Sequence, residues 1–283
     1  MRPILFFCLI LTTLMAIVSA HPAGAQETAP ANQAPTPQVP SEITGNRRLT
    51  ERFAEDGGMV RQGWMEAGAR YASWGDGHDL TVETLMAFRV FENIELGGRV
   101  GYMDRSRSKG EILFGERLPD ATQENGLTDL DLFAKFRVRR SPLETSLGFR
   151  LKIPVADDAE RLGSGGTDYE VFLGTRRTFQ RCAWVGNAGV RFNGDSRATG
   201  RAAGRTSVLL GGGAIVTLAY SWTFFAEAAF ETRRYSGDDP DLRLVPAIEY
   251  RPTENLSFRL GASVGLTDGS PDQETTLAAV FQF

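Results

Sequence analysis

Hydrophobic and polar residues alternate with a period of two along most of the chain beyond residue 60. Leu80, Val82 and Phe88, for example, fall on one face of such a segment, while Glu83 and Arg89 fall on the other. Successive side chains of a β-strand point to opposite faces, so this pattern predicts strands that are apolar on one side. No stretch in this part of the chain has the pattern of a long amphipathic helix.

The alternation predicts twelve strands, each close to the roughly 9–11 residues that cross a bilayer at a tilt. They cover residues 62–73, 80–90, 94–102, 130–138, 143–153, 168–178, 182–192, 206–218, 222–233, 241–250, 256–266 and 274–283. Five connections are tight turns, and the others are longer and polar, at 74–79, 104–127, 154–167, 193–205, 234–240 and 267–273. Short turns on one side and long loops on the other are typical of outer-membrane barrels.

A soluble all-β sandwich or barrel has alternating strands as well. Its apolar face would point inward, and twelve strands would enclose a lumen too wide for the many glycine and alanine side chains to fill. With the apolar face outward, no charge lies in the middle of a strand facing lipid, where one Arg or Lys costs about 2–4 kcal/mol. Residues 61–283 are therefore predicted to form an all-β, transmembrane, antiparallel up-and-down β-barrel of about 12 strands.

The first 60 residues have a different character. Residues 1–25 combine Arg2, an apolar run and a small-residue cleavage pattern, which predicts a secretory signal peptide. Residues 26–60 are predicted to be a disordered periplasmic segment, because their first part is rich in Pro, Ala, Gln and Thr. A short helix is allowed at 49–54. The predicted location is the bacterial outer membrane, after cleavage of the signal peptide.

The chain ends in an alternating strand whose last residue is Phe283. Outer-membrane barrels commonly present such an ending to their assembly machinery. The predicted partners are therefore the barrel assembly machinery, through the strand that ends at Phe283, together with outer-membrane lipid and a small-molecule solute. Nucleic acid is excluded as a partner, because the isoelectric point is about 5.4 and the chain has no recurrent basic run.

With the apolar face outward, twelve basic and eleven acidic residues of the predicted strands face the lumen. The candidate lumen-lining residues are Arg70, Glu83, Arg89, Glu95, Arg99, Asp131, Lys135, Arg137, Arg150, Lys152, Glu170, Arg176, Arg191, Glu227, Arg243, Glu249 and Arg259. Two interpretations of this balance remain open. The charges form a salt-bridge lattice that fills the interior, or they line a narrow wet channel and orient a polar or amphipathic solute.

Residues that carry chemistry are scarce. The two histidines are His21 and His78, and no motif supports His78 as the base that would activate Ser73. Cys182 is the single cysteine beyond the signal peptide, so it has no intramolecular disulfide partner. No phosphate loop or metal motif is present. The sequence therefore predicts a protein that is not an enzyme, with no catalytic, cofactor or metal site.

Three segments resemble one family of outer-membrane transporters, labelled for the MetA pathway of phenol degradation. Residues 126–137 (GLTDLDLFAKFR) resemble its pattern G-x-x-D-L-x-L-x-x-K-aromatic-R. Ile153-Pro154 followed by 162–168 resembles a Gly-rich loop ending in Asp, and 265–272 precedes a final strand ending in Phe. The family usually ends closer to Tyr-Arg-Phe, and this chain lacks that arginine. The resemblance implies uptake of aromatic or other hydrophobic compounds and carries over no site residue.

The function predicted from the sequence is an outer-membrane channel for passive uptake of a small, aromatic or hydrophobic solute. The alternative is a structural or adhesive barrel that acts through its surface loops without transport. The sequence alone leaves this choice open, because the width of the lumen depends on how its side chains and loops are arranged.

Overall fold

The computed structural model describes residues 47–198 and 202–283, and its regular structure is entirely β. The predicted signal peptide lies outside the described residues. The strands are β1 (Gly63–Trp74), β2 (Gly77–Phe91), β3 (Ile94–Arg107), β4 (Ile112–Leu113), β5 (Glu116–Arg117), β6 (Thr122–Leu127), β7 (Leu130–Arg139), β8 (Glu144–Ile153), β9 (Asp168–Thr178), β10 (Cys182–Phe192), β11 (Thr206–Ala219), β12 (Trp222–Glu231), β13 (Asp241–Tyr250), β14 (Leu256–Gly265) and β15 (Gln273–Gln282). No helix long and apolar enough to cross a membrane occurs in 47–198 or 202–283.

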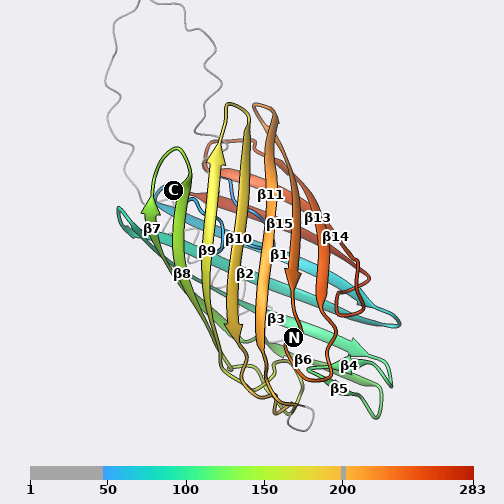
Figure 1. Ribbon diagram of the computed structural model, residues 1–283. Helices are drawn as coiled ribbons and strands as arrows, with labels where there is room; N and C mark the ends of the chain where they lie inside the picture. Colours follow the sequence, from blue (N-terminus) through green and yellow to red (C-terminus); the bar gives the residue numbers. More distant parts are fainter. Residues whose placement is uncertain (1–46, 199–201) are drawn as a thin grey trace, which may run out of the picture. The chain divides into compact units, whose positions relative to one another are not determined.

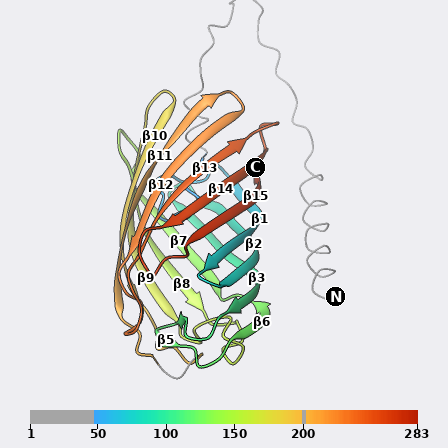
Figure 2. The same cartoon turned by 90° about the vertical axis from the view of Figure 1, so that its right-hand side faces the viewer.

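The strands close into one antiparallel barrel of twelve strand positions, as the sequence predicted (Figures 1 and 2). Neighbours in the chain are neighbours in the sheet, and β1 pairs with β15 to complete the circle. β6 and β7 share one position, because β3 pairs with β7 along its first half and with β6 along its second half. The fold class is therefore confirmed.

Two connections differ from the sequence prediction. The loop expected at 74–79 is a two-residue turn, Gly75-Asp76, made possible by the left-handed conformation of Gly75 at a φ of 54°. The loop expected at 104–127 is largely strand, because β3 continues to Arg107, β6 returns along it, and β4 and β5 form a small hairpin between them. The polar composition of this region indicated a loop, whereas β3 and β6 pair as a ribbon.

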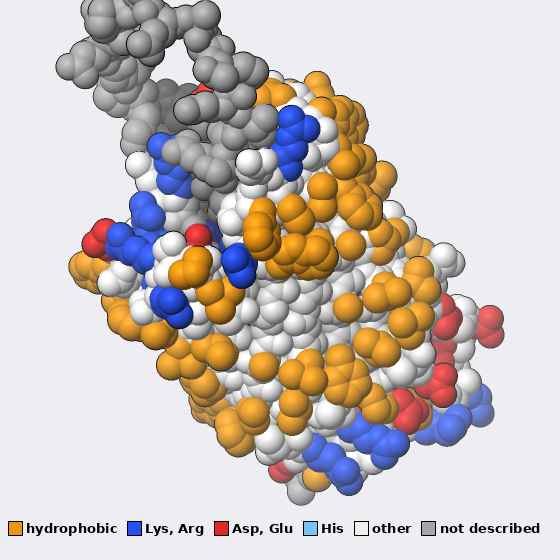
Figure 3. Space-filling view, turned by 45° about the horizontal axis from the view of Figure 1, so that its top comes forward, with side chains coloured by type: hydrophobic (Ala, Val, Ile, Leu, Met, Phe, Trp, Pro, Cys, Tyr) orange, Lys and Arg blue, Asp and Glu red, His pale blue; other side chains and the backbone are white. Residues whose placement is uncertain are grey.

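The outer wall is apolar. Phe136, Leu173 and Leu260 are 51%, 45% and 51% exposed although each lies within a strand. Figure 3 shows hydrophobic side chains spread over the wall, with charged side chains gathered near its two ends. A continuous apolar band between two polar ends is what a lipid bilayer requires of a barrel.

The last residue takes part in closing the barrel. The N–H of Gly63 donates to the carbonyl oxygen of Phe283 at 2.7 Å, and the N–H of Phe283 donates back to Gly63 at 3.2 Å. The rings of Phe88 and Phe283 lie 5.8 Å apart between centroids. Phe283 thus stabilises the seam between β1 and β15, in addition to any role in assembly.

The two faces of the wall should respond differently to a new charge. Leu173→Arg places a guanidinium on the lipid side of β9 and should lower the free energy of unfolding by about 2–4 kcal/mol. Met103→Arg places the same group on the wall of the internal cavity described below and should lower it less. Urea unfolding in phospholipid vesicles measures both. Equal effects of the two substitutions would contradict a lipid-facing position for Leu173.

Candidate functional site

Residues 47–60, hereafter the plug, lie inside the barrel. Every plug residue except Thr50 and Glu51 is buried. The short helix that the sequence allows at 49–54 is absent, and turns and bends take its place. The backbone N–H groups of Thr50, Glu51 and Arg52 all donate to the carboxylate of Glu227, at 2.8–3.1 Å. A carboxylate of β12 therefore binds the backbone in a turn conformation.

Two hydrophobic clusters hold the plug against the wall. Leu49 packs with Ala183, Ile215 and Phe225 from β10, β11 and β12. These side chains point into the lumen, so the inner face of the barrel is partly apolar where the plug meets it. Burial of this apolar surface stabilises the plug in its place.

The second cluster centres on Phe53. Its ring lies 5.4 Å from that of Trp64 on β1 and 6.2 Å from that of Phe133 on β7. Phe172 of β9 and Val280 of β15 complete the cluster. The first cluster involves β10 to β13, and the second involves β1, β7, β9 and β15. Because these strands lie in different parts of the wall, the plug spans the lumen rather than lining one wall.

Buried ion pairs connect the plug to the wall. The Arg176 guanidinium donates to both carboxylate oxygens of Asp56, at 2.8 and 2.9 Å, and both side chains are fully buried. The Lys135 ammonium donates to the carbonyl of Gly58 at 2.8 Å and pairs with Glu95 at 2.9 Å. These contacts satisfy charges that would otherwise be buried alone at a cost of several kcal/mol.

A further buried group lies on β13 and β14. The Glu249 carboxylate accepts hydrogen bonds from Arg47 of the plug and from Arg259, the latter at 2.8 Å. The Arg259 guanidinium also lies over the rings of Trp64 and Phe225, at 5.7 and 4.9 Å. The plug, β13 and β14 are thus held by one shared carboxylate.

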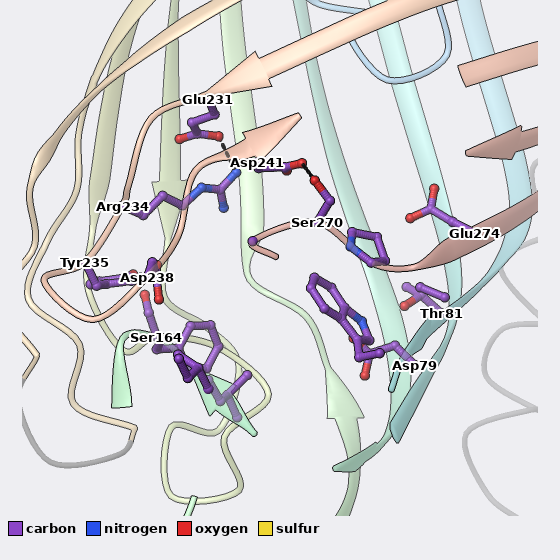
Figure 4. Close-up of a pocket in the computed structure, with 18 of the residues that line it drawn as sticks. Asp79, Thr81, Ser164, Glu231, Arg234, Tyr235, Asp238, Asp241, Ser270 and Glu274 are labelled. Carbon is purple, nitrogen blue, oxygen red and sulfur yellow. Dashed lines mark hydrogen bonds and ion pairs between the residues drawn. The ribbon is translucent and has the colours of Figure 1, made fainter. Parts of the chain in front are cut away.

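The lumen also contains a cavity of about 780 Å³, and Glu51 and Arg52 of the plug form part of its lining. Among the described residues, fifteen acidic and eleven basic side chains line it. Figure 4 shows the cavity, with Thr81, Glu274 and Asp241 around it, and marks the contacts between Glu231 and Arg234 and between Asp241 and Ser270.

The cavity also has aromatic lining near the β4–β5 hairpin. Phe114, whose φ is 49°, lies at the tip of this hairpin and meets Tyr235 edge-on at 6.2 Å. The Arg105 guanidinium lies 5.6 Å from the ring of Phe114, and that of Arg107 lies 5.1 Å from the ring of Trp74. The hairpin therefore extends over the end of the cavity away from the plug and contacts the loop between β12 and β13.

Burial affects ionisation in that loop. It raises the pKa of the Tyr235 hydroxyl, an effect that the nearby Lys152 ammonium partly offsets. It also raises the pKa of the Asp238 carboxyl, against the opposing effect of Arg234. Both groups are thus less readily charged than in open solution.

One continuous series of ion pairs joins this loop to the plug. Successive members lie 2.6–3.7 Å apart. The series consists of Arg234, Glu231, Arg191, Glu170, Arg150 and Glu55. It therefore links a loop at one end of the lumen to a carboxylate of the plug.

The structure divides the candidate lumen residues into three groups. Those that line the cavity are Arg70, Glu83, Arg99, Asp131, Arg150, Lys152, Glu170, Arg191 and Arg243. Those that contact the plug, directly or through one neighbour, are Glu95, Lys135, Arg176, Glu227, Glu249 and Arg259. Arg89 and Arg137 are half-buried near the ends of β2 and β7. Arg233, the last residue of the strand predicted at 222–233, lies beyond the end of β12 and is exposed.

The plug residues are the part of the site that sequence reasoning missed. Periodicity identifies side chains that alternate along strands, and the plug has no strand. One signal was present: Leu49, Phe53 and Val60 place large apolar groups in a charged segment, unlike the Pro-rich residues before them. Such a composition supports burial more than disorder.

Comparison with known proteins supports the fold. No protein-family model matches the chain, and no curated protein matches its sequence. The structure is similar to the COG4313 outer membrane channel from Pseudomonas putida F1, with a TM-score of 0.63 and 10% identity over 83% of this chain and 100% of that one. It is also similar to the KdgM porin, with a TM-score of 0.51 and 14% identity over 77% and 99% of the two chains. At these identities the likeness establishes the barrel fold alone.

The pair between Asp56 and Arg176 should be important for keeping the plug in place. Asp56→Ala leaves a fully buried guanidinium without this carboxylate and should destabilise the plug by about 3–5 kcal/mol. Trypsin cleavage after Arg48 and Arg52, followed by mass spectrometry, should then become much faster. Glu92→Ala, which removes an exposed partner of Arg140, should leave cleavage unchanged. Equal cleavage of the Asp56 variant and the unmodified protein would contradict a stabilising role for the pair.

Proposed function

We propose that the protein is an outer-membrane channel for passive uptake of a small solute. The observation that carries the proposal is the cavity of about 780 Å³ inside the barrel, lined by charged and aromatic side chains. A lattice of ion pairs that filled the lumen throughout would leave no such space. A purely structural or adhesive barrel has no need of it, so the cavity favours transport over that alternative.

The proposed solute has an aromatic or hydrophobic body. Trp74, Phe114 and Tyr235 line the same end of the cavity, and a stacked or edge-on aromatic contact contributes about 0.5–1.5 kcal/mol. The resemblance of residues 126–137 to the transporters labelled for phenol degradation supports the same class of solute. The similarity in fold to outer-membrane channels supports the barrel of the proposed channel and not the class of solute. We infer that the chain belongs to that transporter family.

The proposed location is the bacterial outer membrane, reached after removal of residues 1–25. The apolar outer wall requires a bilayer, and closure leaves no unpaired strand edge inside it. We propose that the barrel assembly machinery recognises the last strand through Phe283. No catalytic role is proposed, since transport through a cavity needs no reacting group.

Purified protein in planar bilayers should show a small conductance with a weak preference for cations. The preference follows from the excess of acidic over basic side chains in the cavity lining. The strand pattern alone predicted nearly equal numbers of the two charges in the lumen, and therefore no preference. Phenol should reduce the current. Trp74→Ala should raise the phenol concentration for half effect by about 2- to 10-fold, whereas Trp222→Ala on the outer wall should not. Absence of any current, with unchanged liposome uptake of phenol, would refute transport.

Deletion of Phe283 should sharply reduce the amount of assembled barrel while export continues, because the seam between β1 and β15 loses its terminal hydrogen bonds. Heat-modifiable migration of the outer-membrane fraction on gels measures the folded form. Phe258→Ala, which changes another exposed ring on the outer wall, is the matched control and should assemble normally. Normal assembly without Phe283 would refute its role, and recovery of the intact protein in the soluble periplasm would refute the proposed location.

A further inference from the structure

The plug presents one carboxylate to the base of the cavity. Glu51 lies between two arginines of the wall, 3.7 Å from Arg70 of β1 and 3.5 Å from Arg243 of β13. It lines the cavity and its side chain is 20% exposed, unlike the deeper plug residues. The two guanidiniums thus hold an acid that belongs to a different segment from their own strands.

The two arginines are also held by the wall itself. Arg70 donates to Glu83 at 3.0 Å, and Arg243 donates to Asp241. Glu274 of β15 lies 3.7 Å from each of them. These wall carboxylates position both guanidiniums. If Glu51 moved away, Arg70 and Arg243 would therefore stay in place, and one of the carboxylates around them would be missing.

We propose that Arg70 and Arg243 form a carboxylate-binding site of the channel, and that Glu51 of the plug occupies it in place of the carboxylate of a transported solute. This inference rests on the proposed channel function and specifies part of its solute. Guanidinium forks match carboxylate geometry, and two of them directed at one position form a strong anion site. The plug is thereby an internal competitor of the solute.

The charge at the other end of the cavity restricts the solute further. Asp238, Asp239, Asp268 and Asp272 all belong to the loops around that end. Their field extends over a screening length of about 8–10 Å at moderate salt and opposes the entry of multiply charged anions. The site therefore suits a single carboxylate carried on a larger, otherwise neutral body.

Because the solute and Glu51 compete for one site, the effect of each on the binding of the other is reciprocal. If the seated plug weakens carboxylate binding by a given factor, then a bound carboxylate weakens seating of the plug by the same factor. A solute that reaches the base of the cavity would consequently favour the arrangement in which residues 47–60 are displaced.

Acetate provides a direct test, because Glu51→Ala removes a CH₂–COO⁻ group that acetate matches in size and charge. In full-length purified protein, Glu51→Ala should speed trypsin cleavage after Arg52 at least threefold, since one anchor of the plug is lost. Acetate should restore the slow rate in this variant, with a saturable dependence on concentration. Acetamide, and sodium chloride at equal ionic strength, should not restore it.

Two further variants locate the effect. Glu92→Ala removes an exposed acid that pairs with Arg140 rather than with Arg70, so cleavage after Arg52 should stay slow in the absence of acetate. Adding Arg243→Met to Glu51→Ala should abolish rescue. Rescue by chloride or acetamide, rescue that persists without Arg243, or unchanged cleavage of Glu51→Ala would each overturn the proposal.

The unmodified protein offers a second measurement that does not depend on folding of a variant. Here acetate competes with Glu51, so it should accelerate cleavage after Arg52, and acetamide should have no effect; no acceleration up to molar acetate would overturn the proposal. Proteolysis needs no conduction. Absence of current in every variant would contradict the channel function and leave the acetate result standing, whereas current without acetate dependence would contradict only the carboxylate site.

Discussion

The interior of this protein depends on the need to neutralise buried charge. Lipid requires the outer wall to be apolar, so alternation places the charged side chains in the lumen. Side chains of a barrel of this width do not fill the lumen by themselves. Arg176 and Lys135 are fully buried, and the plug supplies Asp56 and the carbonyl of Gly58 as partners to them. The plug therefore completes a polar core that the strands leave unfinished.

The same requirement links distant parts of the lumen. In the series from Arg234 to Glu55, Glu231 and Glu170 each lie between two arginines, so a change at one pair alters the partners available to the next. Low solvent content makes such networks more strongly coupled than isolated surface pairs. The loop that contacts the β4–β5 hairpin and the plug at the base of the cavity are thus parts of one electrostatic arrangement. Residues of both line the cavity.

Much of the fold was predictable from the sequence, because a strand in a membrane barrel has a period of two and a known length. Leu173 and Phe136 illustrate this, since their exposure on the outer wall follows from alternation alone. The plug was not predictable in this way. Its turns depend on Glu227, which lies 175–177 residues away in the chain. A local sequence pattern cannot predict a contact at that separation. The strands within 104–127 were missed because the polar composition of this region indicates a loop, although β3 and β6 pair there as a ribbon.

The contacts between the plug and the wall are partly apolar and partly ionic, and this affects the free energy needed to move the plug. A wholly apolar contact would expose hydrocarbon to water when the plug moved, at about 25 cal/mol for each Å². Buried ion pairs contribute little net stability compared with well-packed apolar groups, because both partners are also well solvated in water. Replacing part of the apolar contact by pairs such as Glu55 with Arg150 and Glu51 with Arg243 thus keeps the closed arrangement specific while lowering the free energy needed to hydrate the lumen. A segment held in this way can close a channel without closing it permanently.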